Sequence, residues 1–309
     1  MPRHSGGTAT EAHKVRATPR TSDALEPEPR YELRTMGLIV ESWPAQDILR
    51  WASERFSSRL TFATGFGAEG CVMIDLIARL QLPVDVFTLD TGLLFPETYD
   101  LWARLERTYG VTIRAVQPAQ SVPEQARLHG DRLWEREPAR CCALRKVAPL
   151  QGALKGFDAW LTAIRRDQTL ARANARGVEW DERFHLVKVN PLVRWSKPDV
   201  WQYIQTHNVP YNALHDSGYP SIGCQPCTTR VGLDEDERAG RWRGQQKTEC
   251  GLHASDDAGR APRSQADTLP ELARGDMSPL DARPAAPIPA DAVHADAAHA
   301  DAPQPEVTT

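Results

Sequence analysis

The sequence contains no apolar run of the roughly 18 residues that a membrane-spanning helix requires. Its opening stretch, MPRHSGGTATEAHKVRATPR, also lacks the apolar segment that a secretion signal needs. These two absences predict a cytoplasmic protein without a membrane partner. The formal net charge is only −4 over 309 residues, so no general attraction to nucleic acid is expected. Partners are therefore expected to be small molecules or proteins, with basic stretches such as AIRRDQTLARANAR as local anion sites.

A common nucleotide-binding motif is also missing, because the chain contains no G-x-x-x-x-G-K-[ST]. An ordinary phosphate-binding loop is thereby not supported. Cysteine is scarce, with six residues in the chain. In a reducing compartment, thiols that cluster in sequence bind metal or carry redox chemistry more often than they form a disulfide framework.

The composition divides the chain into three parts. With 41% hydrophobic and 25% charged residues, the chain fits one globular domain of ordinary size with some excess length. Residues 1–35 are rich in Thr, Pro, Arg and Glu without apolar periodicity, and residues 254–309 are rich in Ala, Asp and Pro. Both ends are predicted to be disordered. Residues 36–253 are predicted to form the functional domain, with a mobile segment at its C-terminal end.

Helical and strand-like patterns alternate along this domain. Strands that alternate with helices predict an α/β fold, with an open, mostly parallel sheet and helices on both faces. Ligands of such sheets bind at the carboxyl ends of the strands. Helices are expected over residues 44–58, 67–80, 96–110, 141–154 and 197–208, and strands over 59–64, 84–90, 111–116, 158–164 and 184–192.

Two loops are expected at this carboxyl edge. TFATGFGAEG follows the first strand and opens a helix, so Gly65 and Gly67 lie where the free N–H groups of the helix can bind an anion. LDTGLLFPETY places Asp90, Thr91 and Gly92 at the end of the next strand. The coincidence of two such loops favours a nucleotide crevice, although each loop can also be read as a simple turn.

The cysteines provide two pairs. Cys141 and Cys142 are adjacent, and Cys224 and Cys227 form a C-x-x-C motif. Four thiolates are the ligand set of an iron–sulfur cluster or a structural zinc site. Adjacent residues project about 100° apart on a helix, which favours a multi-iron cluster over one tetrahedral ion. Ordinary buried thiols are the third interpretation, and that interpretation is preferred for Cys71 on an apolar helix face.

Cys250 lies in KTECGLH, after a polar stretch and before the Ala/Asp/Pro-rich tail, so an accessible and mobile thiol is expected. The neighbouring Glu249 disfavours the thiolate, and activation therefore has to come from cations elsewhere. The segment DERAGRWRG supplies Arg238, Arg241 and Arg243 just before it. A thiol without a function near the end of the domain is the alternative.

With these elements in order, the sequence resembles the assimilatory sulfonucleotide reductases of the iron–sulfur type, over roughly residues 45 to 253. The resemblance is carried by TGFGAEG, LDTGLLFPETY, CCALRKVAPL, AIRRDQT, NPLVRWSKPDVWQYI, YPSIGCQPCT, ERAGRWRG and ECGLH. It implies an adenine-nucleotide alpha-hydrolase-like fold. It also implies reduction of adenylyl sulfate to sulfite and AMP in sulfate assimilation and cysteine biosynthesis, through an enzyme S-sulfocysteine that thioredoxin or glutaredoxin resolves.

The resemblance assigns roles to individual residues. It makes Cys250 the nucleophile, and it places Lys146 between the substrate sulfate and a cluster. One [4Fe–4S] cluster is implied, with Cys141, Cys142, Cys224 and Cys227 as its ligands. The remaining substrate contacts that it implies are Thr64, Gly65, Gly67, Ala68, Glu69, Leu89, Asp90, Thr91, Gly92, Arg165, Arg166, Arg238, Arg241 and His253.

The chain departs from the usual pattern of these reductases in its nucleotide loops. Phe66 stands where a small hydroxyl residue is common, Gly70 stands where an acid is, and Gly92 is followed by Leu-Leu-Phe. Three alternatives to adenylyl sulfate reduction are considered: reduction of 3′-phosphoadenylyl sulfate, an ATP-dependent RNA sulfur transferase, and a non-catalytic iron–sulfur sensor. A homo-oligomer is also compatible with the sequence.

Overall fold

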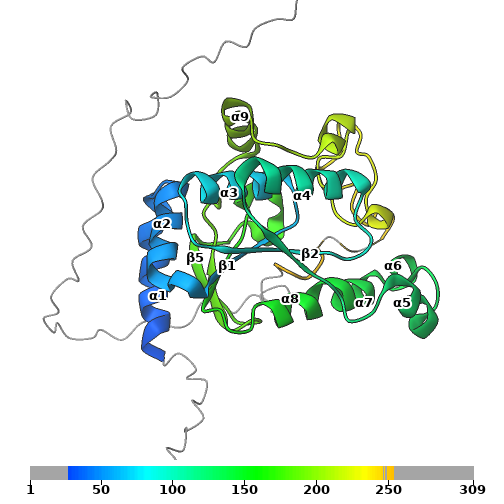
Figure 1. Ribbon diagram of the computed structural model, residues 1–309, viewed down its shortest axis with the longest axis horizontal. Coiled ribbons are helices and arrows are strands. Elements are labelled where there is room, and N and C mark those ends of the chain that lie inside the picture. The colour runs from blue at the N-terminus through cyan, green and yellow to red at the C-terminus, as the bar shows by residue number, and fades with distance from the viewer. Residues whose placement is uncertain (1–26, 246, 248, 254–309) are drawn as a thin grey trace, which may run out of the picture. The chain divides into compact units, whose positions relative to one another are not determined.

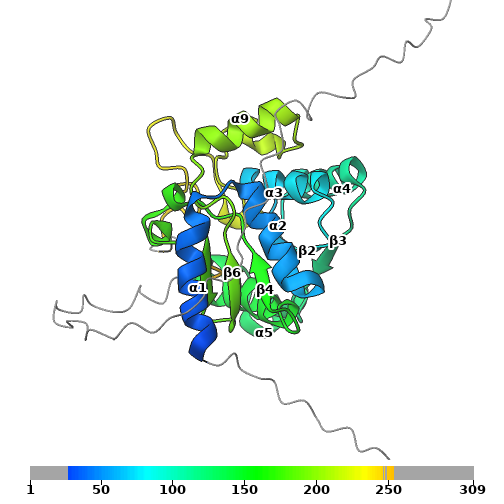
Figure 2. The same ribbon diagram turned by 90° about the vertical axis from the view of Figure 1, so that its left-hand side faces the viewer.

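The computed structural model describes residues 27–245, 247 and 249–253. The predictions for residues 1–26 and 254–309 lie outside these residues, and the predicted boundary at residue 35 is wrong. Helix α1 (Pro27–Ile39) begins before it and lies beside the sheet (Figure 2). Leu33 and Met36 pack against the core. A Cβ on Gly37 would lie 2.6 Å from the carbonyl oxygen of Val178, so only glycine allows α1 to approach the sheet this closely.

The core of the domain is one six-stranded sheet with the order β3-β2-β1-β4-β6-β5. All neighbouring strands are parallel except β5 and β6. The prediction of an open, mostly parallel sheet is confirmed. The antiparallel edge strand β5 was not predicted. The strands are β1 (Leu60–Thr64), β2 (Asp85–Leu89), β3 (Ile113–Val116), β4 (Ala159–Leu161), β5 (Val178–Asp181) and β6 (Leu186–Val189).

Helices cover both faces of this sheet, as predicted (Figure 1). One face carries α2 (Ala45–Phe56), α3 (Ala68–Arg79), α4 (Pro96–Tyr109) and α9 (Lys197–His207). The other carries α5 (Val122–His129), α6 (Leu133–Arg136), α7 (Pro138–Cys142) and α8 (Ala148–Ala153). No helix in the described part of the chain is both long and apolar enough to span a membrane.

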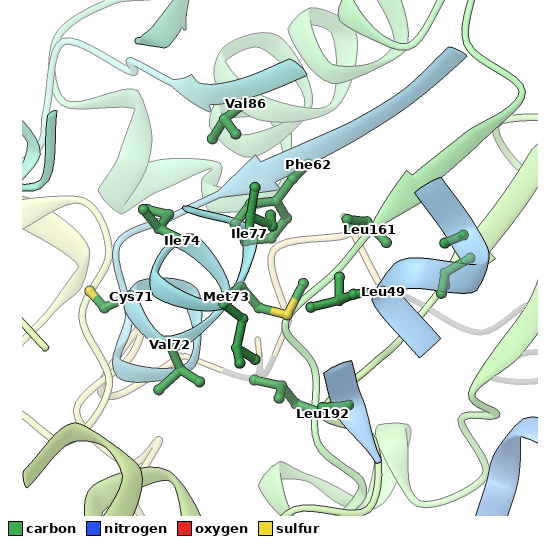
Figure 3. Close-up of a cluster of buried hydrophobic side chains, with 14 of the residues drawn as sticks. Leu49, Phe62, Cys71, Val72, Met73, Ile74, Ile77, Val86, Leu161 and Leu192 are labelled. Atoms are coloured by element: carbon green, nitrogen blue, oxygen red, sulfur yellow. The ribbon is translucent and has the colours of Figure 1, made fainter. Parts of the chain in front are cut away.

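The strands build two cores because their side chains alternate between the faces. Phe62 and Leu161 point into the larger core, where they meet Leu49 of α2 and Met73 of α3 (Figure 3). Phe87 and Trp160 belong to a smaller core on the other face, together with Leu150 and Leu154 near α8. Each fully buried side chain of this size contributes roughly 1.5–3 kcal/mol of transfer free energy.

The strand order places a switch point between β1 and β4. From β1 the chain proceeds outward through β2 and β3, and it then returns to add β4 on the opposite side of β1. Loops that leave two neighbouring strands in opposite directions open a crevice at the carboxyl edge. The candidate site is therefore expected beyond the ends of β1 and β4.

The single helix predicted over residues 141–154 is divided. Helix α7 ends at Cys142, a π-helical turn covers Ala143–Val147, and α8 continues from Ala148. Pro149 accounts for the interruption, because it has no N–H for the carbonyl of Arg145 and its ring would collide with that carbonyl in a regular α-helix. The extra residue in the turn changes which way Arg145 and Lys146 point relative to the cysteine pair.

Asp75 joins three helices in the larger core. Its fully buried carboxylate accepts hydrogen bonds from Arg79 Nε at 2.8 Å, Tyr109 Oη at 2.9 Å and Tyr203 Oη at 2.6 Å. We expect Asp75→Ala to lower the free energy of unfolding by on the order of 3 kcal/mol, because two tyrosine hydroxyls lose their acceptor. Urea unfolding followed by circular dichroism measures this loss.

Asp47→Ala is the matched control. Asp47 pairs with Arg50 at 2.8 Å, but both side chains are exposed on α2. Its removal is expected to change the free energy of unfolding by less than about 0.5 kcal/mol. Equal effects of the two substitutions would contradict the role assigned to Asp75.

Candidate active site

A cavity of about 240 Å³ lies at the carboxyl ends of β1, β2 and β4, where the strand order places the crevice. Thr64 and Gly65 at the end of β1, Leu89 at the end of β2 and Ile164 after β4 contribute to its lining. The sheet thus brings together loops that are far apart in the sequence.

The β1–α3 loop forms one wall. The hydroxyl of Thr64 accepts a hydrogen bond from the N–H of Phe66 at 3.1 Å, and Gly67 is the N-cap residue of α3. Phe66 turns its ring into the core, where it stacks on Trp102 with 5.6 Å between ring centroids. A Cβ on Gly70 would lie 2.8 Å from the Thr64 hydroxyl oxygen. Both departures from the family pattern therefore have a packing reason.

The β2–α4 loop forms a second wall, but only some of its residues line the cavity. Leu89 and Thr91 line the cavity, whereas Asp90 and Gly92 do not. Asp90 accepts hydrogen bonds from the Gly92 N–H at 3.0 Å and the Tyr99 hydroxyl at 2.7 Å, and Gly92 has a φ of +66°. Asp90 and Gly92 therefore shape the loop instead of contributing to the cavity wall.

The two cysteine pairs meet in one small pocket behind this loop. It is lined by Cys141, Cys142, Cys224 and Cys227, together with Leu93, Pro138, Arg145, Lys146 and Trp242. The C-x-x-C turn is attached to the β2–α4 loop, because the Gln225 N–H donates to the Leu93 carbonyl at 2.7 Å. The Thr91 hydroxyl lies 3.3 Å from Cys224 Sγ.

The spacing of these thiols does not suit a single ion. A tetrahedral zinc ion with Zn–S bonds of about 2.3 Å draws its thiolates to within about 3.8 Å of one another. Within the described ranges, no three Cys, His, Asp or Glu side chains are arranged to hold one metal ion. Four cysteines line the common pocket with no histidine or carboxylate among them, and this donor set suits a polynuclear cluster.

Lys146 connects the two pockets. Of the residues that line either one, Lys146 alone lines both within the described part of the chain. Burial disfavours its cationic form, but the nearby Cys224 and Cys250 outweigh this effect and raise the pKa of Lys146. The same cation, with help from Thr91 and Arg241, lowers the pKa of Cys224 although burial opposes it.

Arg145, the neighbouring cation, has a structural role. Its buried guanidinium donates to the carbonyls of Thr91 at 2.6 Å and Gln120 at 3.1 Å, and to the Gln125 side chain at 3.2 Å. It therefore ties the β2–α4 loop to the helices below the sheet. The two adjacent cations of the sequence have different functions, since only Lys146 reaches the cavity.

Three arginines line the cavity, namely Arg172, Arg238 and Arg241. Arg172 and Arg241 are both buried, and in each the Nε atom has no hydrogen-bond partner among the described residues. Buried donors without a partner cost free energy unless a ligand satisfies them. Arg172 and Arg238 pair with Glu249. Arg241 and Lys146 have no carboxylate of the described residues paired to them, and they define a site for an anionic group.

The structure places Arg165 and Arg166 outside the cavity lining, and their contact with the substrate stays a prediction. Arg165 is almost fully buried and pairs with Glu69 at 2.8 Å and with Asp167. Arg166 pairs with Glu41 at 2.5 Å. Both guanidinium groups are directed at carboxylates of the protein, so Arg165 positions the cavity residue Glu69 and Arg166 anchors the chain near α1.

Sequence reasoning missed several residues of the lining. Arg172 follows the RRDQT motif, but nothing in the local pattern distinguishes it from Arg165 or Arg166. Trp160 faces the cavity because a strand alternates its side chains. His215 lies beyond α9, and both of its ring nitrogens are buried without a partner within the described ranges. Only the fold brings these residues to the site.

The segment that carries Cys250 is docked in the cavity (orange in Figure 1). Arg183 donates to the carbonyl oxygen of Gly251, and Leu252 packs against the smaller core. His253 stacks on Trp160 with 5.5 Å between ring centroids and an interplanar angle of 14°. Cys250 itself is half-buried in the cavity wall.

His253 is expected to make this docking depend on pH. Burial, followed by the nearby cations Arg172, Lys188 and Arg238, holds the pKa of docked His253 well below its usual 6.5. The undocked histidine therefore takes up a proton as the pH falls through 6.5, while the docked one stays neutral. Docking should weaken by up to about tenfold per pH unit below 6.5.

Hydrogen exchange of residues 249–253, corrected for the intrinsic pH dependence of amide exchange, measures this effect. Protection should be complete at neutral pH and fall on acidification in the unmodified protein. His253→Gln should remove the pH dependence. A protection factor that is independent of pH in the unmodified chain would exclude the histidine as its cause.

An anion-binding cavity at the switch point of an open α/β sheet is typical of nucleotide-binding proteins, and the thiols around it add sulfur chemistry to that class. Comparisons with known proteins identify the class more closely. Residues 59–230 match the phosphoadenosine phosphosulfate reductase domain. The chain belongs to this family.

Curated relatives and a solved structure agree with this placement. The chain is 49% identical over 213 residues to adenosine 5′-phosphosulfate reductase of Oceanobacillus iheyensis, covering 69% of this chain and 89% of the relative. It is 49% identical over 210 residues to adenosine 5′-phosphosulfate reductase 1 of Bacillus subtilis, covering 68% and 90%. The crystal structure of phosphoadenylyl-sulfate reductase from Candida auris superimposes with a TM-score of 0.59 at 35% identity, over 65% of this chain and 97% of that chain.

Proposed function

We propose that the protein reduces adenylyl sulfate to sulfite and AMP, as the names of its curated relatives suggest. The observation that carries the proposal is the division of the thiols. Four cysteines share one pocket, while Cys250 lies apart from them in the cavity with Lys146 and the arginines. The nucleophile is better kept away from the metal ligands, because coordination to a metal lowers the nucleophilicity of a thiolate.

The reaction proceeds in two transfers. The Cys250 thiolate attacks the sulfur of adenylyl sulfate, the bond from that sulfur to the bridging oxygen breaks, and AMP leaves with the electron pair. The product on the enzyme is S-sulfocysteine. A dithiol then attacks Cys250 Sγ, which releases sulfite, and its second thiol closes a disulfide to regenerate Cys250. The substrate sulfur gains two electrons, and the dithiol loses two.

Electrostatic repulsion is the main barrier that the protein has to offset. A thiolate and a sulfate about 4 Å apart repel each other by roughly 4 kcal/mol at an effective dielectric constant of 20, or about three decades in rate. Lys146 and the arginines of the cavity place positive charge where the two anions meet. Arg241, with its unpartnered Nε, is suited to the phosphosulfate.

The four-cysteine pocket fits one [4Fe–4S] cluster by its donor set. Cys141, Cys142, Cys224 and Cys227 would hold it. When bound, the cluster would supply a fixed negative charge beside Lys146 and would carry no electrons to the substrate. Iron and acid-labile sulfide analysis of anaerobically purified protein tests the assignment independently of activity, and a colourless, metal-free protein would refute it.

Thioredoxin or glutaredoxin is proposed as the dithiol, because the second transfer is a thiol–disulfide exchange at Cys250 Sγ. A reducing cytoplasm is the compartment in which both the dithiol and the free cysteines of this chain persist. The proposed place of the reaction is the assimilation of sulfate for cysteine biosynthesis.

A second candidate substrate is 3′-phosphoadenylyl sulfate. The family description and the Candida auris structure are both named for that nucleotide, whereas the relatives of 47–49% identity are named for the unphosphorylated one. Competition between the two nucleotides in a sulfite-release assay decides between them. Adenylyl sulfate is expected to have the higher kcat/KM.

The proposal is tested by incubating the purified protein with sulfur-labelled adenylyl sulfate in the absence of reductant. The label should appear on Cys250 at up to one equivalent, with one AMP released, and thioredoxin should release it as sulfite. Absence of label from the protein, or label on another residue, would refute the proposal. An RNA sulfur transferase would instead need ATP, and a sensor would take up no label.

A further inference from the structure

Glu249, immediately before Cys250, is held inside the cavity wall. Its carboxylate lies 3.1 Å from Arg172 Nη2 and 3.2 Å from Arg238 Nη2. The Thr169 hydroxyl donates a third contact at 3.4 Å. The Glu249 side chain is 11% exposed, and those of Arg172 and Arg238 are 9% and 16% exposed. An ion pair with so little solvent is screened weakly.

The other anchors of this segment all follow Cys250. Arg183 contacts the carbonyl of Gly251, Leu252 packs into the smaller core and His253 stacks on Trp160. On the N-terminal side of Cys250, the segment is held by the ion pairs of Glu249 with Arg172 and Arg238. Consecutive Cα atoms are about 3.8 Å apart, so anchoring the residues on both sides of Cys250 restricts where its sulfur can lie.

We propose that Glu249 is a positioning residue, whose carboxylate clamps the segment to Arg172 and Arg238 so that Cys250 faces the substrate. The inference rests on the proposed function of Cys250 as the nucleophile. It explains why an acidic residue, which disfavours a neighbouring thiolate, stands beside the reactive cysteine. Fixing the geometry of a reacting group contributes more to the rate than the adjacent charge removes.

The clamp and the substrate use different cations. Glu249 occupies donors of Arg172 and Arg238, while Lys146 and Arg241 line the same cavity with no carboxylate of the described chain paired to them. The anionic end of the substrate can therefore bind while Glu249 stays in place. If Glu249 instead competed with the substrate for the same arginines, its removal would strengthen nucleotide binding.

The test compares Glu249→Gln, Glu249→Asp and the control Glu235→Gln in the full-length protein with its metal content intact. Glu235 also pairs with an arginine, Arg243, at 2.7 Å, but it lies on the surface outside the cavity. Three quantities are measured. They are the rate of Cys250 alkylation by iodoacetamide, read by peptide mass spectrometry, the dissociation constant of AMP, and the single-turnover rate of S-sulfocysteine formation.

Glu249→Gln should slow S-sulfocysteine formation by roughly 10- to 100-fold, the loss typical of a misplaced reacting group. Cys250 should be alkylated several-fold faster, because the segment undocks more often, and AMP affinity should stay within about twofold. Glu249→Asp should recover part of the rate, since it keeps the charge on a shorter side chain. Glu235→Gln should match the unmodified protein in all three measurements.

Two results would overturn the clamp. Alkylation and transfer rates equal to those of the control would show that Glu249 does not position Cys250. Tighter AMP binding with faster transfer would show that it competes with the substrate. The alkylation and AMP measurements do not require turnover, so they judge the clamp even if the unmodified protein forms no S-sulfocysteine and the proposed function fails.

Discussion

Cys250→Ser is expected to abolish sulfite formation while nucleotide binding and iron content stay unchanged. A serine hydroxyl is far less nucleophilic than a thiolate, and removal of a catalytic nucleophile lowers kcat by at least about 10⁴-fold in well-studied enzymes. Cys250 lies in the cavity wall and outside the four-cysteine pocket. Its replacement therefore removes the chemistry without disturbing the residues proposed to hold the cluster.

Cys71 supplies the matched control for this substitution. It is the one cysteine that lines neither pocket, and burial raises the pKa of its thiol to about 12. Cys71→Ala should retain stoichiometric transfer of labelled sulfur, whereas Cys250→Ser should show none. Sulfite release by Cys250→Ser at a rate comparable to that of the unmodified protein would remove Cys250 from the mechanism.

Lys146→Ala is expected to have the second-largest effect, a fall in kcat of about 10²- to 10³-fold. This is the loss that follows removal of one preorganised electrostatic donor, about 2.7–4 kcal/mol. Lys146 alone among the described lining residues reaches both the cavity and the cysteine pocket. Without its cation, the Cys250 thiolate and the incoming sulfate repel each other directly. Single-turnover kinetics with parallel iron analysis measure the effect.

Two further variants define what the lysine contributes. Lys146→Arg keeps the positive charge and should recover part of the rate. Lys155→Ala removes an exposed lysine just beyond α8 and should leave the kinetics unchanged. If Lys146→Ala retained normal kinetics with a full complement of iron, the electrostatic role of the cation between the two pockets would be wrong.

Periodicity along the chain was sufficient to predict most of the sheet. Side chains along a strand alternate between the two faces of the sheet. Phe62 accordingly lies in the larger core, and Phe87 and Trp160 lie in the smaller core on the other face. The edge strand β5 was not predicted, because its sequence, VEWD, is short and carries acidic residues. Charged residues suit an edge strand but lack the apolar pattern of a buried strand. Helix α1 was not predicted, because its apolar residues Leu33 and Met36 lie in a polar stretch of sequence. The helix is stabilised by the packing of these two side chains against the core.

The thiols that line the two pockets could be selected from the sequence, because cysteines that lie close together in a chain with few cysteines indicate a thiol site. The cysteine pair, the C-x-x-C motif and the later Cys250 each stand out by spacing, and the structure gathers them at one edge of the sheet. The arginines could not be sorted in this way. Arg165, Arg166 and Arg172 occur within eight residues of one another, yet only Arg172 faces the cavity.

The sequence by itself determined the α/β class, the loops at the strand ends and the identity of the thiols, because these depend on periodicity and on residue type at short range. The tertiary structure alone decided which cations face the cavity. Arg165 pairs with Glu69 and Arg166 with Glu41, and both carboxylates come from distant parts of the chain. Long-range ion pairs leave no local pattern, so only the assembled fold shows which charges are left for the substrate.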